Sequence, residues 1–195
     1  MQKWFRVKQV MRCTTLVVFL SLVVVTGSYA ADFPLIITTK HTVLMFNTEE
    51  DVALFNDSIR YEAGNSLASI FSTPSSNDVQ KEVMRKVDLL FEKVQLILDM
   101  RKPMPKVIVR IHSNEMQLGE SFRKLYQRGN PPRGWYFFEN NTVYLNVKDV
   151  RENMFAHELG HSIIDNYLSV RPPAATAEIL AQYVDMHLFE EVRHY

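Results

Sequence analysis

The alternation of apolar and polar positions along the chain predicts a mixture of helices and strands. The clearest periodicity lies between residues 78 and 100, where apolar side chains recur at steps of three and four residues and mark the buried stripe of one long helix. Short runs rich in apolar residues predict strands, and the last two of these runs flank a Glu-Asn-Asn turn as a hairpin. The predicted strands span residues 42–46, 106–111, 135–138 and 142–147.

Residues that cap or break helices divide the rest of the chain. Thr48 is followed by three acids and predicts the N-cap of a helix that runs toward Ile59. Asp149 or Asn153 is the expected N-cap of a helix that runs through His161 to about residue 168. Further helices are expected at about 115–126 and 174–190. This order of elements favours an α+β domain with a small mixed or antiparallel sheet and two C-terminal helices.

The first thirty residues have the pattern of a secretory signal peptide. Four basic residues precede an apolar run at 16–25, and Ser28 and Ala30 occupy the −3 and −1 positions of a cleavage site. The run is about ten residues long, whereas about twenty are needed to span a bilayer. We therefore expect residues 1–30 to be removed and residues 31–195 to fold as one domain that is periplasmic or secreted. Retention of the segment as an uncleaved anchor is the alternative.

Removal of that segment changes the charge of the domain and the chemistry open to it. The chain has 22 basic and 22 acidic residues, and the segment takes away four basic residues and no acid, which leaves 18 against 22 and a net charge of −4. A mildly acidic protein is a poor nucleic-acid binder, so no nucleic-acid partner is expected. No stable membrane insertion is expected after cleavage. The only cysteine, Cys13, also leaves, so a metal must be held by His, Asp and Glu side chains.

The chemistry of the chain is concentrated in the motif His157-Glu158-Leu159-Gly160-His161, which lies on one of the predicted helices. A step of four residues turns a helix by about 400°, so the two histidines project from one face, one turn apart. That separation suits two nitrogen ligands of one tetrahedral zinc ion. Glu158 points about 100° away, toward the side where bound water would sit, and is expected to act as general base.

A zinc ion held by two histidines needs a third protein ligand. A metzincin would have Gly and His at the third and sixth positions after the second histidine, where this chain has Ile164 and Tyr167. The next predicted helix carries Glu178, which reaches the metal if the turn at Pro172-Pro173 folds this helix back onto the first. The expected site therefore has two histidines, one glutamate and an open catalytic position. Small residues would let the two helices approach closely: Gly160, Ala177 and Ala181.

The motif His-Glu-Leu-Gly-His, with Glu178 seventeen residues after His161, resembles the gluzincin metallopeptidases, in particular their peptidase MA-like branch. The resemblance extends over most of residues 42–188, and its specific motifs lie in about the last forty residues. It implies a zincin-like fold in which an edge strand precedes the HExxH helix and a Glu-x-x-Ala-x-Tyr helix follows it. It also implies that His157, His161 and Glu178 bind Zn²⁺ and that Glu158 is the base.

Two positions depart from the gluzincin pattern. The family often has Gly after the ligand glutamate and an aromatic residue shortly before it, where this chain has Ile179 and Ala175-Thr176. These differences concern the start of the last helix and the shape of the substrate pocket more than the zinc ligands.

Further residues are candidates for roles around the metal. Tyr183 is the first candidate for the donor that stabilises the oxyanion. It lies about 140° around the helix from Glu178, however, which favours a packing role over this one. Asp165 and Asp185 return to the ligand faces of their helices. Each can accept a hydrogen bond from a ligand histidine and so orient its ring, or can simply be an acid exposed to solvent. The strand at 142–147 can pair, as an exposed edge, with an extended peptide, or can be an ordinary strand. Weaker candidates for the oxyanion donor are Tyr126, Tyr136 and Tyr167.

The function that these observations favour is the zinc-dependent hydrolysis of peptide bonds by an exported enzyme, with a peptide or protein as substrate. Zinc lowers the pKa of bound water toward about 7, and Glu158 takes the water proton and passes it to the leaving amine. One alternative is a protein on a zincin scaffold that binds metal or peptide without turnover. Another is a structural or interaction domain without metal. The intact Glu158 favours the enzyme, because a protein that only binds does not need the base.

Overall fold

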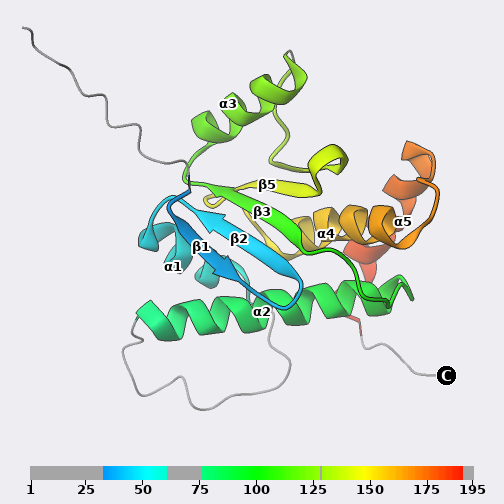
Figure 1. Ribbon diagram of the computed structural model, residues 1–195, viewed down its shortest axis with the longest axis horizontal. Coiled ribbons are helices and arrows are strands. Elements are labelled where there is room, and N and C mark those ends of the chain that lie inside the picture. Colours follow the sequence, from blue (N-terminus) through cyan, green and yellow to red (C-terminus); the bar gives the residue numbers. More distant parts are fainter. Residues whose placement is uncertain (1–32, 61–75, 128, 191–195) are drawn as a thin grey trace, which may run out of the picture. The chain divides into compact units, whose positions relative to one another are not determined.

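The computed structural model describes residues 33–60, 76–127 and 129–190, which form a five-stranded mixed sheet with helices on both faces (Figure 1). This architecture is compatible with the α+β class expected from the sequence. The predicted signal segment, residues 1–30, lies outside the described residues. No helix in the described part of the chain is long and apolar enough to cross a membrane. The described α-helices are α1 (Glu49–Ser58), α2 (Ser76–Ile97), α3 (Glu115–Tyr126), α4 (Glu152–Tyr167) and α5 (Ala174–His187).

The sheet contains the strands β1 (Leu35–Thr38), β2 (Thr42–Phe46), β3 (Val107–His112), β4 (Gly134–Phe137) and β5 (Thr142–Asn146). Across the sheet they follow the order β1-β2-β3-β5-β4. β2, β3 and β5 are parallel to one another, and the two outer strands, β1 and β4, are antiparallel to their neighbours. β1 was not expected from the sequence. Its four residues become a strand through their pairing with β2.

The predicted hairpin is confirmed, but its two strands occupy different places from those expected. β4 and β5 pair antiparallel around the short 3₁₀ helix η2 (Phe138–Asn140). β5 lies between β3 and β4, and all five of its residues are buried. The hypothesis that residues 142–147 form an exposed edge is therefore wrong, because both sides of this strand are paired within the sheet. The edge beside α4 belongs to β4.

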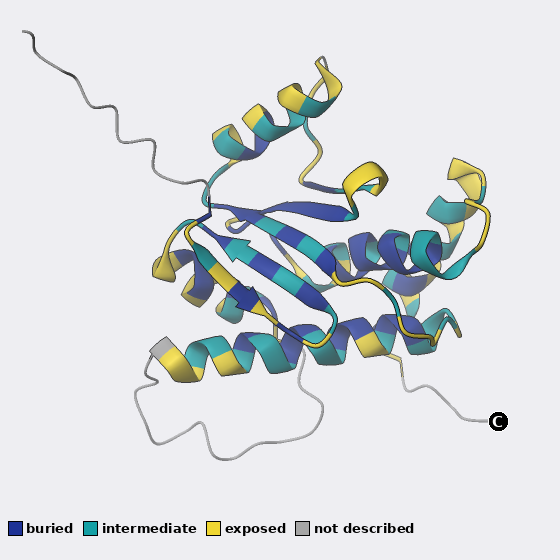
Figure 2. Ribbon diagram, viewed as in Figure 1, coloured by how far each residue is buried: buried dark blue, intermediate teal, exposed yellow. Residues whose placement is uncertain are grey.

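Alternation along the strands gives the sheet two faces of different composition. One face packs against α1, α2, α4 and α5 in a large apolar core, to which β3 contributes Val107 and Val109. The opposite face packs against α3 through a small cluster formed by Leu118, Trp135 and Tyr144. Figure 2 shows buried positions along the strands and along α4, while much of α3 is exposed. α3 and α4 therefore lie on opposite faces of the sheet, and α4 is the more deeply buried of the two.

The observed N-cap agrees with the sequence prediction for α1 but not for α4. Thr48 caps α1 as predicted: its side chain accepts a hydrogen bond from the Asp51 N–H, and the Asp51 carboxylate accepts one from the Thr48 N–H. The N-cap of α4 is Arg151, which makes no side-chain capping bond, so the prediction of Asp149 or Asn153 was wrong. Asp149 instead accepts a hydrogen bond of 2.7 Å from the last residue of β5.

The turn at residues 168–173 folds α5 back onto α4, as the small residues of both helices predict. A Cβ added to Gly160 would lie 3.5 Å from Val184 Cγ2 and 3.7 Å from Ala181 Cα, which is ordinary van der Waals contact.

Alanine is favoured over glycine inside a helix by about 1 kcal/mol. We therefore expect Gly160→Ala to raise the free energy of unfolding, measured in urea, by about 0.5–1 kcal/mol. A loss of stability would show that the helices need a closer approach.

Candidate metal centre

Three side chains of metal-ligating type meet where α4 and α5 pack together. His157 Nε2 lies 3.7 Å from Glu178 Oε1, and His161 Nε2 lies 3.4 Å from Glu178 Oε2. One ligand atom can be chosen from each residue so that all three lie within 4.8 Å of one another. The histidines come from successive turns of α4, and the glutamate comes from the beginning of α5. The structure thus brings together the three residues that the sequence predicts as ligands.

The donor set of this cluster fits a zinc ion. Ligand atoms held tetrahedrally at about 2.0–2.2 Å from zinc lie about 3.3–3.6 Å from each other, close to the two nitrogen–oxygen distances of the cluster. Two imidazoles and one carboxylate are ligands that zinc accepts, and three protein ligands leave a position open, as in catalytic zinc sites. Gln182 Nε2 donates to Glu178 Oε1 at 3.0 Å and so helps to orient the carboxylate.

The environment of His161 favours the protonation state that binds a metal. Burial and the neighbouring His157 lower the pKa of His161, and the charges of Glu178 and Asp165 oppose this only in part. The two imidazole rings lie 4.9 Å apart, edge to face. A lowered pKa keeps the ring neutral near pH 7, and the neutral ring is the ligating form. The His161 ring is therefore in the form that can bind a metal cation near pH 7.

Glu158 lies beside the cluster and is only 8% exposed. Burial raises the pKa of its carboxyl to about 7; the backbone N–H of Tyr136 opposes this with a hydrogen bond, and the Glu178 carboxylate adds to it. A carboxyl group with a pKa near neutrality can accept and release a proton under ordinary conditions. The hydrogen bond from Tyr136 also connects this carboxyl to the edge strand β4.

The raised pKa of Glu158 predicts how pH affects the stability of the metal-free protein. Between pH 4.5 and about 7, the folded carboxyl holds a proton that the unfolded one has lost, so the free energy of unfolding falls as pH rises through this window. A pKa raised from 4.5 to about 7 corresponds to about 3 kcal/mol. Metal-free Glu158→Gln is therefore expected to exceed the wild type in stability by up to about 3 kcal/mol at pH 8, and to match it at pH 4.

Urea denaturation of the two metal-free proteins at several pH values between about 4 and 8 measures this difference. Because both proteins carry the same histidines, their titration cancels in the comparison. A difference in stability that does not change with pH would contradict the raised pKa of Glu158.

A pocket of about 280 Å³ opens beside the candidate ligands. Trp135 and Tyr136 of β4 form part of its wall, together with Asp165 and Arg171. Arg171 is held in place, because its Nε donates to Asp165 Oδ1 at 3.2 Å and its guanidinium carbon lies 3.6 Å from the centre of the Phe138 ring. Arg171 was not predicted as a site residue, because it follows the end of α4, where helical periodicity no longer applies. The signal that points to it is its place in the turn between the two ligand-bearing helices.

Tyr183 is not among the residues that line this pocket. It is 44% exposed, and its ring stacks on His187 with 3.9 Å between the ring centroids. A position about 140° around α5 from Glu178 directs a side chain away from the ligands. The structure therefore gives no support to Tyr183 as the oxyanion donor. Of the weaker tyrosine candidates, Tyr136 alone lines the pocket, and its hydroxyl donates to Asn141 Oδ1 at 3.1 Å.

The two aspartates that were candidates to orient a histidine differ in position. Asp165 lines the pocket, and its Oδ2 is buried without a hydrogen-bond partner among the described residues. Its charge favours the protonated form of His161 and so opposes part of the lowering of the His161 pKa that burial causes. Asp185 is not among the lining residues. The structure therefore favours Asp165 over Asp185 for this role.

Comparison of the chain with protein-family models, with curated proteins and with solved structures returns no match. The function must therefore be inferred from the site itself. The site offers a His-His-Glu cluster with suitable spacing, a buried glutamate beside it, and a pocket bounded by an edge strand.

Proposed function

We propose that the protein is a zinc-dependent peptidase with a zincin-like architecture. The observation that carries this proposal is the meeting of His157 and His161 of α4 with Glu178 of α5, with Glu158 buried beside them. The first three residues would hold Zn²⁺, and the fourth would move protons. A purely structural domain would gain nothing from a buried glutamate that lowers stability above neutral pH.

His157, His161 and Glu178 would hold a Zn²⁺ ion, which would supply Lewis acidity toward a water molecule and the scissile carbonyl. Glu158 accepts the proton of the attacking water and later releases it to the leaving amine. Arg171 is oriented by Asp165 and lines the same pocket, so its remaining N–H groups can hold the negative charge that develops on the substrate. These roles require no residue outside the described pocket.

Strand β4 is the proposed guide for the substrate. It forms the edge of the sheet beside α4, and its residues Trp135 and Tyr136 line the pocket. An extended peptide can add to such an edge as a further strand, and its backbone would then lie beside the ligands. The hydrogen bond from the Tyr136 N–H to Glu158 connects this edge with the base. We therefore propose for β4 the pairing with a peptide that was one of two possibilities for residues 142–147.

The place of action is inferred from the N-terminal pattern. A basic segment, an apolar run and small residues before position 31 support export to the periplasm or beyond. The substrate proposed for such an enzyme is an extracytoplasmic peptide or protein.

Digestion of a peptide library tests the proposal. The zinc-loaded protein is expected to cleave a subset of the peptides, to lose this activity when a chelator removes the metal, and to regain it when zinc is restored. A protein that only binds would take up zinc and cleave nothing. Hydrolysis that persists after the zinc has been removed would contradict a zinc enzyme.

A further inference from the structure

A second pocket lies between the sheet and α3, on the face opposite the main core. Its volume is about 390 Å³, in the range of pockets that hold small molecules. β3 contributes Arg110 and His112 to its wall, β5 contributes Tyr144, and α3 contributes Lys124. Phe33, which precedes β1, completes part of the wall. We refer to this cavity as the Arg110 pocket.

Arg110 faces this pocket because side chains alternate along β3. Val109 and Ile111 are buried in the main core, so the residue between them points to the other face of the sheet. Its guanidinium carbon lies 5.7 Å from the centre of the Phe33 ring and 5.9 Å from that of the Tyr144 ring. The two aromatic rings hold the guanidinium group and limit its contact with water.

The charge of Arg110 is not balanced by the residues described around it. Its Nε is buried and has no hydrogen-bond partner among the described residues. Glu120 is the only acid among the lining residues that the structure describes, and no ion pair between described residues joins it to Arg110. Lys124 adds a second positive charge to the same wall. A buried donor of a charged group that lacks a partner is unfavourable, so the pocket favours an anion.

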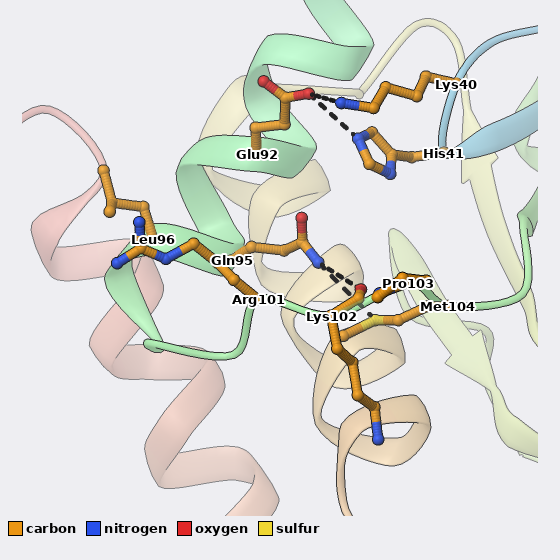
Figure 3. A pocket seen from close by; sticks show the side chains of 9 residues that line it. All are labelled: Lys40, His41, Glu92, Gln95, Leu96, Arg101, Lys102, Pro103 and Met104. Atoms are coloured by element: carbon orange, nitrogen blue, oxygen red, sulfur yellow. Dashed lines mark hydrogen bonds and ion pairs between the residues drawn. The ribbon is translucent and has the colours of Figure 1, made fainter.

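In the larger pocket beside the turn between β1 and β2, Lys40 and His41 both contact Glu92 (Figure 3). Glu92 Oε1 accepts a hydrogen bond of 2.7 Å from Lys40 Nζ and lies 3.2 Å from His41 Nε2. Gln95 Nε2 donates to the Met100 carbonyl at 3.3 Å. These side chains have partners within the protein, whereas Arg110 Nε has no hydrogen-bond partner among the described residues.

We propose that the Arg110 pocket binds the carboxylate or phosphate group of a small anionic ligand. A guanidinium group offers N–H donors in a fixed plane that match two oxygens of such a group. Lys124 adds a point charge from α3, and the aromatic rings exclude water that would weaken the contact. The site is separate from the proposed catalytic pocket, because the two share no lining residue.

Titration of the metal-free protein with inorganic phosphate and, separately, with succinate tests this proposal. Binding to the wild type and to every variant is measured by isothermal titration calorimetry. Contact with Arg110 is followed by its Nε–H resonance in ¹⁵N NMR spectra of the wild type, which is assigned by its disappearance in Arg110→Met. We expect a saturable shift of this resonance with at least one of the two anions. The anion that binds then identifies the group that the pocket recognises. The metal is removed so that no anion can bind to zinc.

Three variants distinguish a built site from general attraction to positive charge. Arg110→Met is expected to weaken anion binding by at least about tenfold, and Lys124→Gln by about threefold. Arg123→Gln is the matched control for Lys124→Gln, because Arg123 is exposed on α3 next to Lys124 but does not line the pocket. This variant should bind the anion with the affinity of the wild type. Ligand-free Arg110→Met should also unfold at the wild-type temperature or above, since it removes an unpaired charge.

The absence of saturable binding of either anion to the folded protein would overturn the proposal. Binding that neither Arg110→Met nor Lys124→Gln weakens would also overturn it, as would an equal loss in Arg123→Gln. A lower unfolding temperature of ligand-free Arg110→Met, together with unchanged binding in Lys124→Gln, would assign Arg110 a structural role instead.

Discussion

Replacement of Glu158 by glutamine is expected to lower kcat/KM for peptide hydrolysis by about 10²–10⁴-fold while zinc stays bound at one ion per chain. The amide keeps the size of the carboxyl group but cannot accept the proton of the attacking water. The proposed ligands His157, His161 and Glu178 are unchanged in this variant. Turnover of a fluorogenic peptide chosen from the library digest gives the rate, and elemental mass spectrometry gives the zinc content.

The same substitution separates the chemical step from folding. Metal-free Glu158→Gln is expected to be at least as stable as the wild type at pH 8, so unfolding would not explain a loss of activity. A variant that retains full activity would show that Glu158 is not the base. A variant that loses zinc together with activity would place Glu158 among the ligands, in contradiction to its proposed role.

Glu178→Ala is expected to weaken zinc binding by more than about 100-fold, since even groups that only orient ligands contribute about 10–100-fold. The carboxylate lies 3.4–3.7 Å from a nitrogen of each histidine, and its loss would leave two protein ligands. Competition with a zinc-binding dye measures the affinity. Unchanged zinc affinity would show that Glu178 is not the third ligand.

Two other substitutions on α5 serve as graded controls for this measurement. Gln182→Ala removes the hydrogen bond to Glu178 Oε1, and we expect a loss of about tenfold. Asp185→Ala removes an acid that does not line the pocket, and its zinc affinity should equal that of the wild type. If Asp185→Ala weakened zinc binding as much as Glu178→Ala, the choice of ligand would be wrong.

The candidate ligands were predictable because they rest on local patterns. A four-residue spacing on a helix is enough to place His157 and His161 on one face. Glu178 required the further assumption that the proline turn folds the last helix back, and the packing of Gly160 against Ala181 confirms this arrangement. The helix at 76–97 and the hairpin strands follow in the same way from periodicity and turn residues.

Features that depend on residues distant in the sequence were not predictable in this way. The order of the strands decides which one lies at the edge, and the apolar run at 142–147 reads the same at an edge as in the interior. Arg171 and Arg110 gain their importance only from their neighbours in space, such as the ring of Phe138 or that of Phe33. No periodicity along the chain encodes such neighbours.

Anomalous diffraction at the zinc absorption edge, from crystals of the zinc-loaded protein, tests the central claim most directly. We predict one strong anomalous peak between α4 and α5, at about 2.0–2.2 Å from a nitrogen of His157, a nitrogen of His161 and an oxygen of Glu178. A peak bound by other residues, or no peak at this cluster, would contradict the assignment of the site.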